Sequence, residues 1–163
     1  RSLEADIAYL KQKQDNGADY IMTQLCWDMD QFRYWLDAIR AAGIWMPVDV
    51  GIMPVLDQAA TINMALSHNG CVMDRELCRL ISKYWIFPNP FCVGLKTAKG
   101  DEACFEADVE GKKAAFKEAG IEYTIRQIDQ YRACGINGIH LYALNKYDDV
   151  ARIAKEAGLL DLI

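Results

Sequence analysis

Three short apolar segments that alternate with helical stretches constrain the fold of this chain more than any other feature. The first is Tyr20–Met22, which follows a Gly-Ala-Asp turn and ends on Thr23 and Gln24. The others lie within residues 45–54 (WMPVDVGIMP) and 135–145 (GINGIHLYALN). Near-continuous apolar strands joined through helices and short loops are typical of a parallel sheet with covered faces. The sequence therefore predicts an α/β fold with parallel strands.

Capping residues and the spacing of apolar side chains predict the first two helices. Ser2 caps a helix that ends near Asn16, and Asp28 or Asp30 caps a second one that ends at Gly43. In the first helix the apolar positions recur at helical spacing, so one side of it is expected to pack on the strands.

Four further helices are expected, at residues 55–67, 74–84, about 105–134 and 148–157. Gly120 is a potential interruption of the longest one. Asn145 is the expected cap of the last helix, because asparagine is common at that position. Residues 85–107 contain prolines and glycines without a regular period, and we interpret them as an irregular insertion.

Three strands with their helices suit one arc of a (βα)8 TIM-type barrel, which needs eight strands. We therefore interpret residues 1–163 as a single, partial barrel domain. Functional groups of such barrels gather where the strands end. Gln24, the turn at Gly51–Pro54 and the segment Tyr142–Asn145 all follow strands in this way. A buried amide costs free energy unless it is paired, so a ligand at the barrel mouth gives Gln24 a physical reason to be there.

Composition narrows the range of functions. The 163 residues carry a net charge of −5 that is spread along the chain, which argues against nucleic acid or an anionic membrane as a partner. No apolar run is long enough to cross a bilayer and no signal peptide opens the chain, so a cytoplasmic location is expected. The six cysteines form no CxxC pair, and the histidines lie far apart, so no metal site is expected. Because the chain begins with Arg1 inside a helix, we expect it to be a piece of something longer.

Each candidate residue has a structural alternative. The Gln24 amide suits the polar edge of a heterocycle, but it equally suits a bond to neighbouring loop backbone. His140 is expected to be a core histidine, with Tyr142 on the same face of its strand. Asp6 and Lys13 share a helical face, which is usually solvated. An aromatic cluster is expected to pack helix against barrel, and it comprises Trp27, Phe32, Tyr34 and Trp35.

Several segments together resemble the methylenetetrahydrofolate reductase family. They are DIAYLKQKQDNGADYIMTQLCWD, AAGIWMPVDVGIMPV, HNGCVMDREL and AGIEYTIRQIDQYRACGINGIHLY with the following ALNK. The resemblance implies a flavin-dependent barrel enzyme of one-carbon metabolism that reduces methylenetetrahydrofolate to methyltetrahydrofolate. It implies FAD, with FMN as the alternative, and a reduced nicotinamide or another electron donor. The matching segments correspond to about the last three βα units, the C-terminal portion of the barrel domain.

Residue by residue, the resemblance implies a folate-binding role for Gln24 and Tyr142 and a flavin-binding role for Asp6 and Lys13. Met64 and Lys146 stand where the family has an aromatic residue against the folate and an arginine, so they are substrate-binding positions by the same comparison. In the strand at 48–52 the sequence also departs from the family pattern, since Val50 replaces a proline and Asp49 precedes it.

The catalytic glutamate of the family comes from the first strand and is expected upstream of Arg1, so we expect the isolated chain to be inactive. A partial barrel is also expected to associate with itself or with a partner chain. The alternatives are a non-catalytic barrel remnant or subunit that binds pterin or packs with a partner, and a different pterin- or phosphate-binding barrel enzyme.

Overall fold

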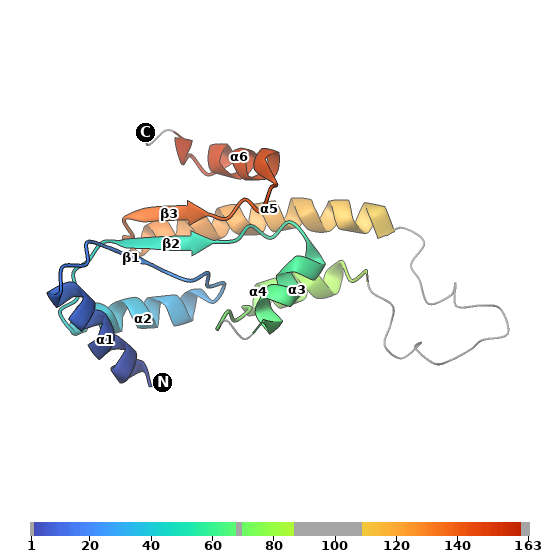
Figure 1. The fold of residues 1–163 in the computed structure, drawn as a ribbon. Helices are drawn as coiled ribbons and strands as arrows, with labels where there is room; N and C mark the ends of the chain where they lie inside the picture. The colour runs from blue at the N-terminus through green and yellow to red at the C-terminus, as the bar shows by residue number, and fades with distance from the viewer. Residues whose placement is uncertain (1, 68–69, 87–108, 161–163) are drawn as a thin grey trace.

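The computed structural model describes residues 2–67, 70–86 and 109–160. These residues form a mixed α/β structure in which helices pack against a small parallel sheet (Figure 1). In chain order the elements are α1 (Leu3–Asp15), β1 (Ile21–Met22), α2 (Met29–Ala41), β2 (Val48–Ile52), α3 (Gln58–Leu66), α4 (Arg75–Lys83), α5 (Val109–Ala133), β3 (Gly138–Leu141) and α6 (Tyr147–Glu156).

The predicted parallel sheet is confirmed. Its strand order is β1-β2-β3, and both pairs run parallel. The strands are shorter than the apolar segments, because only their centres pair as regular ladders. Side chains extend the pairing at both ends: the Asn137 Oδ1 atom accepts from the Val48 N–H at 3.1 Å, and the Thr23 hydroxyl accepts from the Gly51 N–H at 3.2 Å.

The two faces of the sheet differ in character. One face is buried against α2, α5 and α6, and its strand residues Ile21, Val48 and Val50 belong to the main core. Alternate residues point to the opposite face. Met22 on that face is 50% exposed, and His140 is exposed as well. The helices of the described part of the chain thus pack on the first face and leave the second face open (Figure 1).

A second core lies beyond the carboxyl end of β2, where α3, α4 and the first half of α5 meet. Helix α5 contributes to both cores, with Phe116 in the second and Ile128 in the main one. It runs unbroken through Gly120, so the interruption considered there does not occur. Gly120 is needed for close approach instead, since a Cβ atom at this position would lie 1.8 Å from the Val55 carbonyl oxygen.

The capping predictions are mostly confirmed. Ser2 and Asp28 accept backbone N–H groups in the first turns of α1 and α2. Asp74, which was not predicted as a cap, does the same in α4. The prediction for Asn145 is wrong: α6 begins after Lys146, without a side-chain cap. Asn145 has a φ of 64°, in the left-handed region, and an N-cap residue needs an extended backbone instead.

Of the expected insertion at 85–107, only residues 85 and 86 belong to the described part of the chain. None of the described helices is both long and apolar enough to traverse a bilayer. Within the same residues, no group of histidine, cysteine, aspartate and glutamate side chains is arranged to hold a metal ion.

Gly120→Ala tests the close packing of α5 on Val55. The added methyl group must displace a backbone carbonyl, so we expect the free energy of unfolding to fall by at least about 2 kcal/mol. Thermal unfolding monitored by circular dichroism measures this change. Gly111→Ala is the control, because Gly111 is an exposed position of the same helix and alanine there favours the helix. Equal stability of the two variants would contradict the packing.

Candidate functional site

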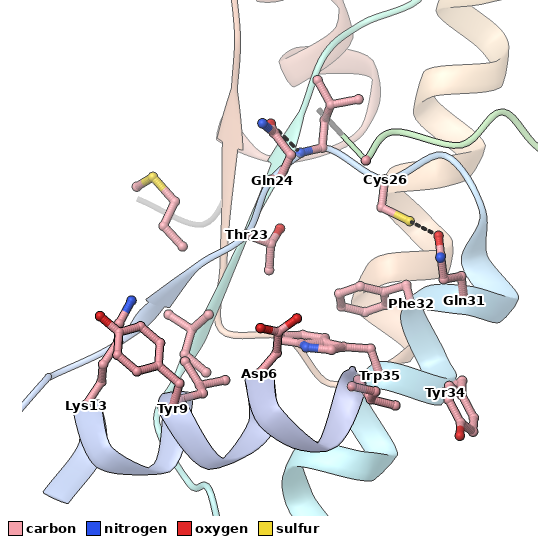
Figure 2. A pocket seen from close by; sticks show the side chains of 16 residues that line it. Asp6, Tyr9, Lys13, Thr23, Gln24, Cys26, Gln31, Phe32, Tyr34 and Trp35 are labelled. Carbon is pink, nitrogen blue, oxygen red and sulfur yellow. Dashed lines mark hydrogen bonds between the residues drawn. The ribbon is translucent and has the colours of Figure 1, made fainter. Parts of the chain in front are cut away.

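A cavity of about 600 Å³ lies between α1, the end of β1 and α2. Asp6 and Lys13 line it from α1, and Gln24 lines it from the end of β1 (Figure 2). Three of the residues that the family resemblance singled out therefore surround one cavity, although Gln24 lies in a different element from the other two.

Helix α1 forms one wall of this cavity. Asp6, Tyr9 and Lys13 project from the same side of the helix toward β1 (Figure 2). The ammonium group of Lys13 lies 4.9 Å from the centre of the Tyr9 ring, which is cation–π distance. The wall thus offers a carboxylate, an aromatic ring and an ammonium group along two helical turns.

The position of this wall depends on Gln14, because α1 has no fully buried residue. The Gln14 amide donates to the Gly43 carbonyl oxygen at 3.1 Å and accepts from the Trp45 N–H at 2.7 Å. Ile7 and Leu10 add partly buried contacts with the main core. One amide side chain therefore ties α1 to the loop that leads into β2.

Gln24 is exposed to the cavity, and its amide is oriented by its own loop. The Oε1 atom accepts from the Leu25 N–H at 2.9 Å. Because a backbone N–H can only donate, this bond fixes which end of the amide carries the oxygen. In the described part of the chain the amide nitrogen has no hydrogen-bond partner, so it can donate to an acceptor group of a ligand. The structural alternative for Gln24 holds for its amide oxygen, which bonds loop backbone, and a ligand-binding role remains a prediction for its amide nitrogen.

The loop after β1 is held by side chains that the sequence did not single out. The Cys26 carbonyl oxygen accepts from the Gln127 amide at 2.9 Å and from the Tyr131 hydroxyl. The Trp27 carbonyl oxygen accepts from the Tyr123 hydroxyl at 3.5 Å. All three donors lie on α5. Only their helical spacing on a mostly apolar face could have drawn attention to them.

The remaining predicted site residues lie elsewhere. Tyr142 and Lys146 line a smaller cavity of about 170 Å³ past the end of β3. Met64 is partly buried against the second core and lines neither this cavity nor the larger one. The Tyr142 ring also lies over Gly51, since a Cβ atom there would be 3.1 Å from the phenol oxygen. The same Cβ atom would be 2.8 Å from the Thr23 carbonyl oxygen, so this ring reaches across β2 toward the end of β1.

His140 is not the core histidine that the sequence predicted. It is exposed on the open face of the sheet and stacks edge-on against Tyr142, with 4.7 Å between the ring centres. The core prediction is wrong because alternation directs His140 away from the helices and toward the face that Tyr142 occupies. The predicted shared face of His140 and Tyr142 is confirmed.

The predicted packing of the aromatic cluster is confirmed for some of its members and wrong for one. Trp27 and Phe32 are buried, as the packing prediction requires, and Phe32 meets Tyr131 edge-on at 4.7 Å. Trp35 is partly buried against the main core. Tyr34 departs from the prediction, because it is 67% exposed.

Asp49 is a further polar group on the open face. A Cβ atom at Gly138 would lie 2.2 Å from the Asp49 carboxylate, so the carboxylate occupies the space above this glycine. The sequence signal for this group was an acidic residue inside an apolar strand. In the sequence alone, Asp49 is only a departure from the family pattern.

A parallel α/β sheet whose polar side chains gather beside the carboxyl ends of its strands is the arrangement of ligand-binding α/β proteins. Sequence comparisons give the particular class. Residues 1–81 match the family model described as Methylenetetrahydrofolate reductase. Nearly the whole chain is similar to curated members, and it belongs to the methylenetetrahydrofolate reductase family.

Three relatives illustrate the similarity. "Methylenetetrahydrofolate reductase 1" of Schizosaccharomyces pombe is 32% identical over 98% of this chain and 22% of its own length. "Methylenetetrahydrofolate reductase (NADH) 1" of Arabidopsis thaliana is 30% identical over 98% of this chain and 23% of its own length. "Probable methylenetetrahydrofolate reductase (NADPH)" of Caenorhabditis elegans is 29% identical over 99% of this chain and 20% of its own length. The chain thus spans about a fifth of the length of these relatives.

Cys26 provides a test of how closed the loop after β1 is. Burial raises the pKa of the Cys26 thiol from 9.0 to about 11. The folded protein therefore favours the protonated thiol, and at pH 8 only about 0.1% of Cys26 is the reactive thiolate. We expect iodoacetamide to label the exposed Cys78 long before Cys26 at pH 8, with Cys26 labelling rising steeply toward pH 11. Peptide mass spectrometry measures both sites, and comparable rates in urea provide the control. Equal rates in the folded protein would contradict a partly buried Cys26 with a raised pKa.

Proposed function

We propose that this chain is part of the catalytic barrel of a methylenetetrahydrofolate reductase-like flavoprotein. Support comes from family membership, the parallel three-stranded sheet and the open sheet face. In this proposal the other strands of a (βα)8 barrel come from the rest of the protein and cover that face. Because the chain spans about a fifth of its relatives' length, the activity belongs to the whole protein.

The observation that carries the proposal is the cavity that joins Asp6, Lys13 and Gln24. The α1 wall has the chemistry that a flavin nucleotide needs. An ammonium group suits its phosphates, a carboxylate suits its ribose hydroxyls, and the Tyr9 ring suits contact with a planar group. FAD fits this donor set, as does FMN.

When bound, a flavin supplies hydride transfer between a reduced electron donor and the folate-bound one-carbon unit. This chain's own residues bind and orient. Lys13 and Asp6 hold the cofactor, and the Gln24 amide nitrogen donates to an acceptor on the folate. Tyr142 and Lys146 complete the folate side, with Lys146 offering a point charge in place of a bidentate guanidinium. Met64 is assigned to the folate side by the family resemblance alone, since it lines neither cavity.

The electron donor is a reduced nicotinamide in this proposal, in keeping with the NADH and NADPH in the names of two relatives. The catalytic glutamate is contributed from upstream of Arg1. A cytoplasmic location, without nucleic acid or membrane as partner, belongs to the same proposal.

Gln24→Leu and Lys13→Met in the full-length protein separate the two halves of the site. Gln24→Leu keeps the approximate volume and removes the donor to the folate, which costs about 1–3 kcal/mol. Folate affinity and turnover should fall about 10- to 100-fold, while flavin content stays normal. Lys13→Met should lower flavin content and leave folate affinity of the flavin-loaded fraction nearly unchanged.

Flavin absorbance and folate titration measure the two effects. Lys11→Met is the control for lost charge, because Lys11 pairs with Asp15 on the same helix and does not line the cavity. Loss of flavin in Gln24→Leu, with folate affinity intact, would reverse the two assignments and sink the proposal.

The isolated chain should associate and lack reductase turnover. The outer edges of β1 and β3 are unpaired within the described residues, and exposed strand edges invite pairing with another chain. Sedimentation velocity should therefore give dimers or larger species at micromolar concentration. A sharp monomeric boundary, or measurable methylenetetrahydrofolate reduction by this chain alone, would contradict the partial-barrel proposal.

A further inference from the structure

We propose that Gln127 and Tyr131 of α5 are positioning residues for the Gln24 amide and act through the Cys26 carbonyl group. This inference rests on the proposed role of Gln24 as a folate-binding residue. It adds two side chains that lie more than a hundred residues further along the chain.

The loop after β1 needs such support for a physical reason. Residues 25–28 belong to neither the strand nor the helix, so regular backbone pairing does not satisfy them. The loop is nevertheless close-packed, since Leu25 is 5% and Trp27 is 1% exposed. A buried carbonyl group without a donor costs free energy.

Side chains supply these donors one carbonyl after another. The Leu25 carbonyl oxygen accepts from the Cys71 thiol at 3.4 Å. The Cys26 carbonyl oxygen accepts from both Gln127 and Tyr131. The Trp27 carbonyl oxygen accepts from the Tyr123 hydroxyl. Only Cys26 receives two donors from one helix, and a carbonyl oxygen has two lone pairs to accept them.

The two donors are themselves rigid. Gln127 is 3% exposed and Tyr131 is fully buried. The Tyr131 ring is fixed edge-on against Phe32 of α2, and burial raises the pKa of its hydroxyl, so it remains a donor at physiological pH. The Cys26 carbonyl group is therefore held in one direction by groups that have little freedom to move.

This direction reaches Gln24 through two peptide units. The Gln24 Oε1 atom takes its orientation from the Leu25 N–H. The Leu25 side chain is anchored in the second core, so a turn of the Cys26 carbonyl must be absorbed by the backbone around residue 25. The bond between this N–H and Gln24 then rotates, and the amide nitrogen changes its direction with it.

The test removes the donors and retains the shapes. Gln127→Met keeps a long side chain, and Tyr131→Phe keeps the ring on Phe32. Each single variant leaves the other donor in place, so we expect folate affinity of the full-length protein to fall about two- to threefold. The double variant leaves the Cys26 carbonyl without a donor and should lower folate affinity about tenfold, with flavin content unchanged. Methyltetrahydrofolate is the titrated probe.

A double-mutant cycle with Gln24→Leu distinguishes positioning from general support. If Gln127 and Tyr131 act through Gln24, the Gln127→Met/Tyr131→Phe pair should lower folate affinity less than twofold in the Gln24→Leu background. Gln58→Met is the matched control. Gln58 is a buried glutamine that donates to the Ile81 and Tyr84 carbonyl oxygens, away from the candidate site. This control should lower the melting temperature and leave folate affinity unchanged.

An equal loss of folate affinity in both backgrounds, or in the Gln58 control, would overturn the inference and leave the proposed function intact. No effect of Gln24→Leu on folate affinity would overturn the role of Gln24 itself, and the inference with it. If the double variant does not fold, the two single variants decide in the same cycle: their losses must disappear when Gln24 is leucine.

Discussion

The carbonyl groups of the loop after β1 impose the constraint on which much of this structure depends. A chain that leaves a strand and turns into a helix inside a packed interior must find donors for backbone that no ladder can satisfy. Here α5 provides them, through Tyr123, Gln127 and Tyr131. Helix α5 therefore has to lie against this loop. The regular pairing of β1 ends before the loop, where side chains of α5 take over as hydrogen-bond donors.

The same requirement explains why α5 is long and unbroken. It joins the main core to the second core, and at the junction it comes close to the backbone of Val55. Gly120 provides the space. Thr124, one turn later, donates to the Gly120 carbonyl oxygen at 2.8 Å and accepts from the Val55 N–H at 3.1 Å. A glycine that lowers helix propensity is thus offset by a contact that only glycine permits.

The sequence predicted what short-range patterns determine. Apolar runs and their spacing predicted the parallel sheet, and Ser2 and Asp28 marked helix starts because a cap bonds backbone within three residues. Several of the misses depend on contacts between distant parts of the chain. His140 and Gly120 depend on what lies opposite them, and the donors on α5 meet carbonyl groups about a hundred residues away. Only the family resemblance predicted a binding role for Asp6 and Lys13, because their spacing alone indicated an ordinary solvated face.

On the open face of the sheet, two glycines make room for polar side chains of the neighbouring strand. Gly51 and Gly138 lie on adjacent strands, and each is covered by a side chain of the other strand: Tyr142 covers Gly51, and Asp49 covers Gly138. A larger residue at either glycine would push these polar groups off the sheet. In a closed barrel this face would be withdrawn from water, and a carboxylate there would need a cationic partner or a solvated interior. A barrel of the proposed kind that includes this chain must therefore place a positive charge or water against Asp49.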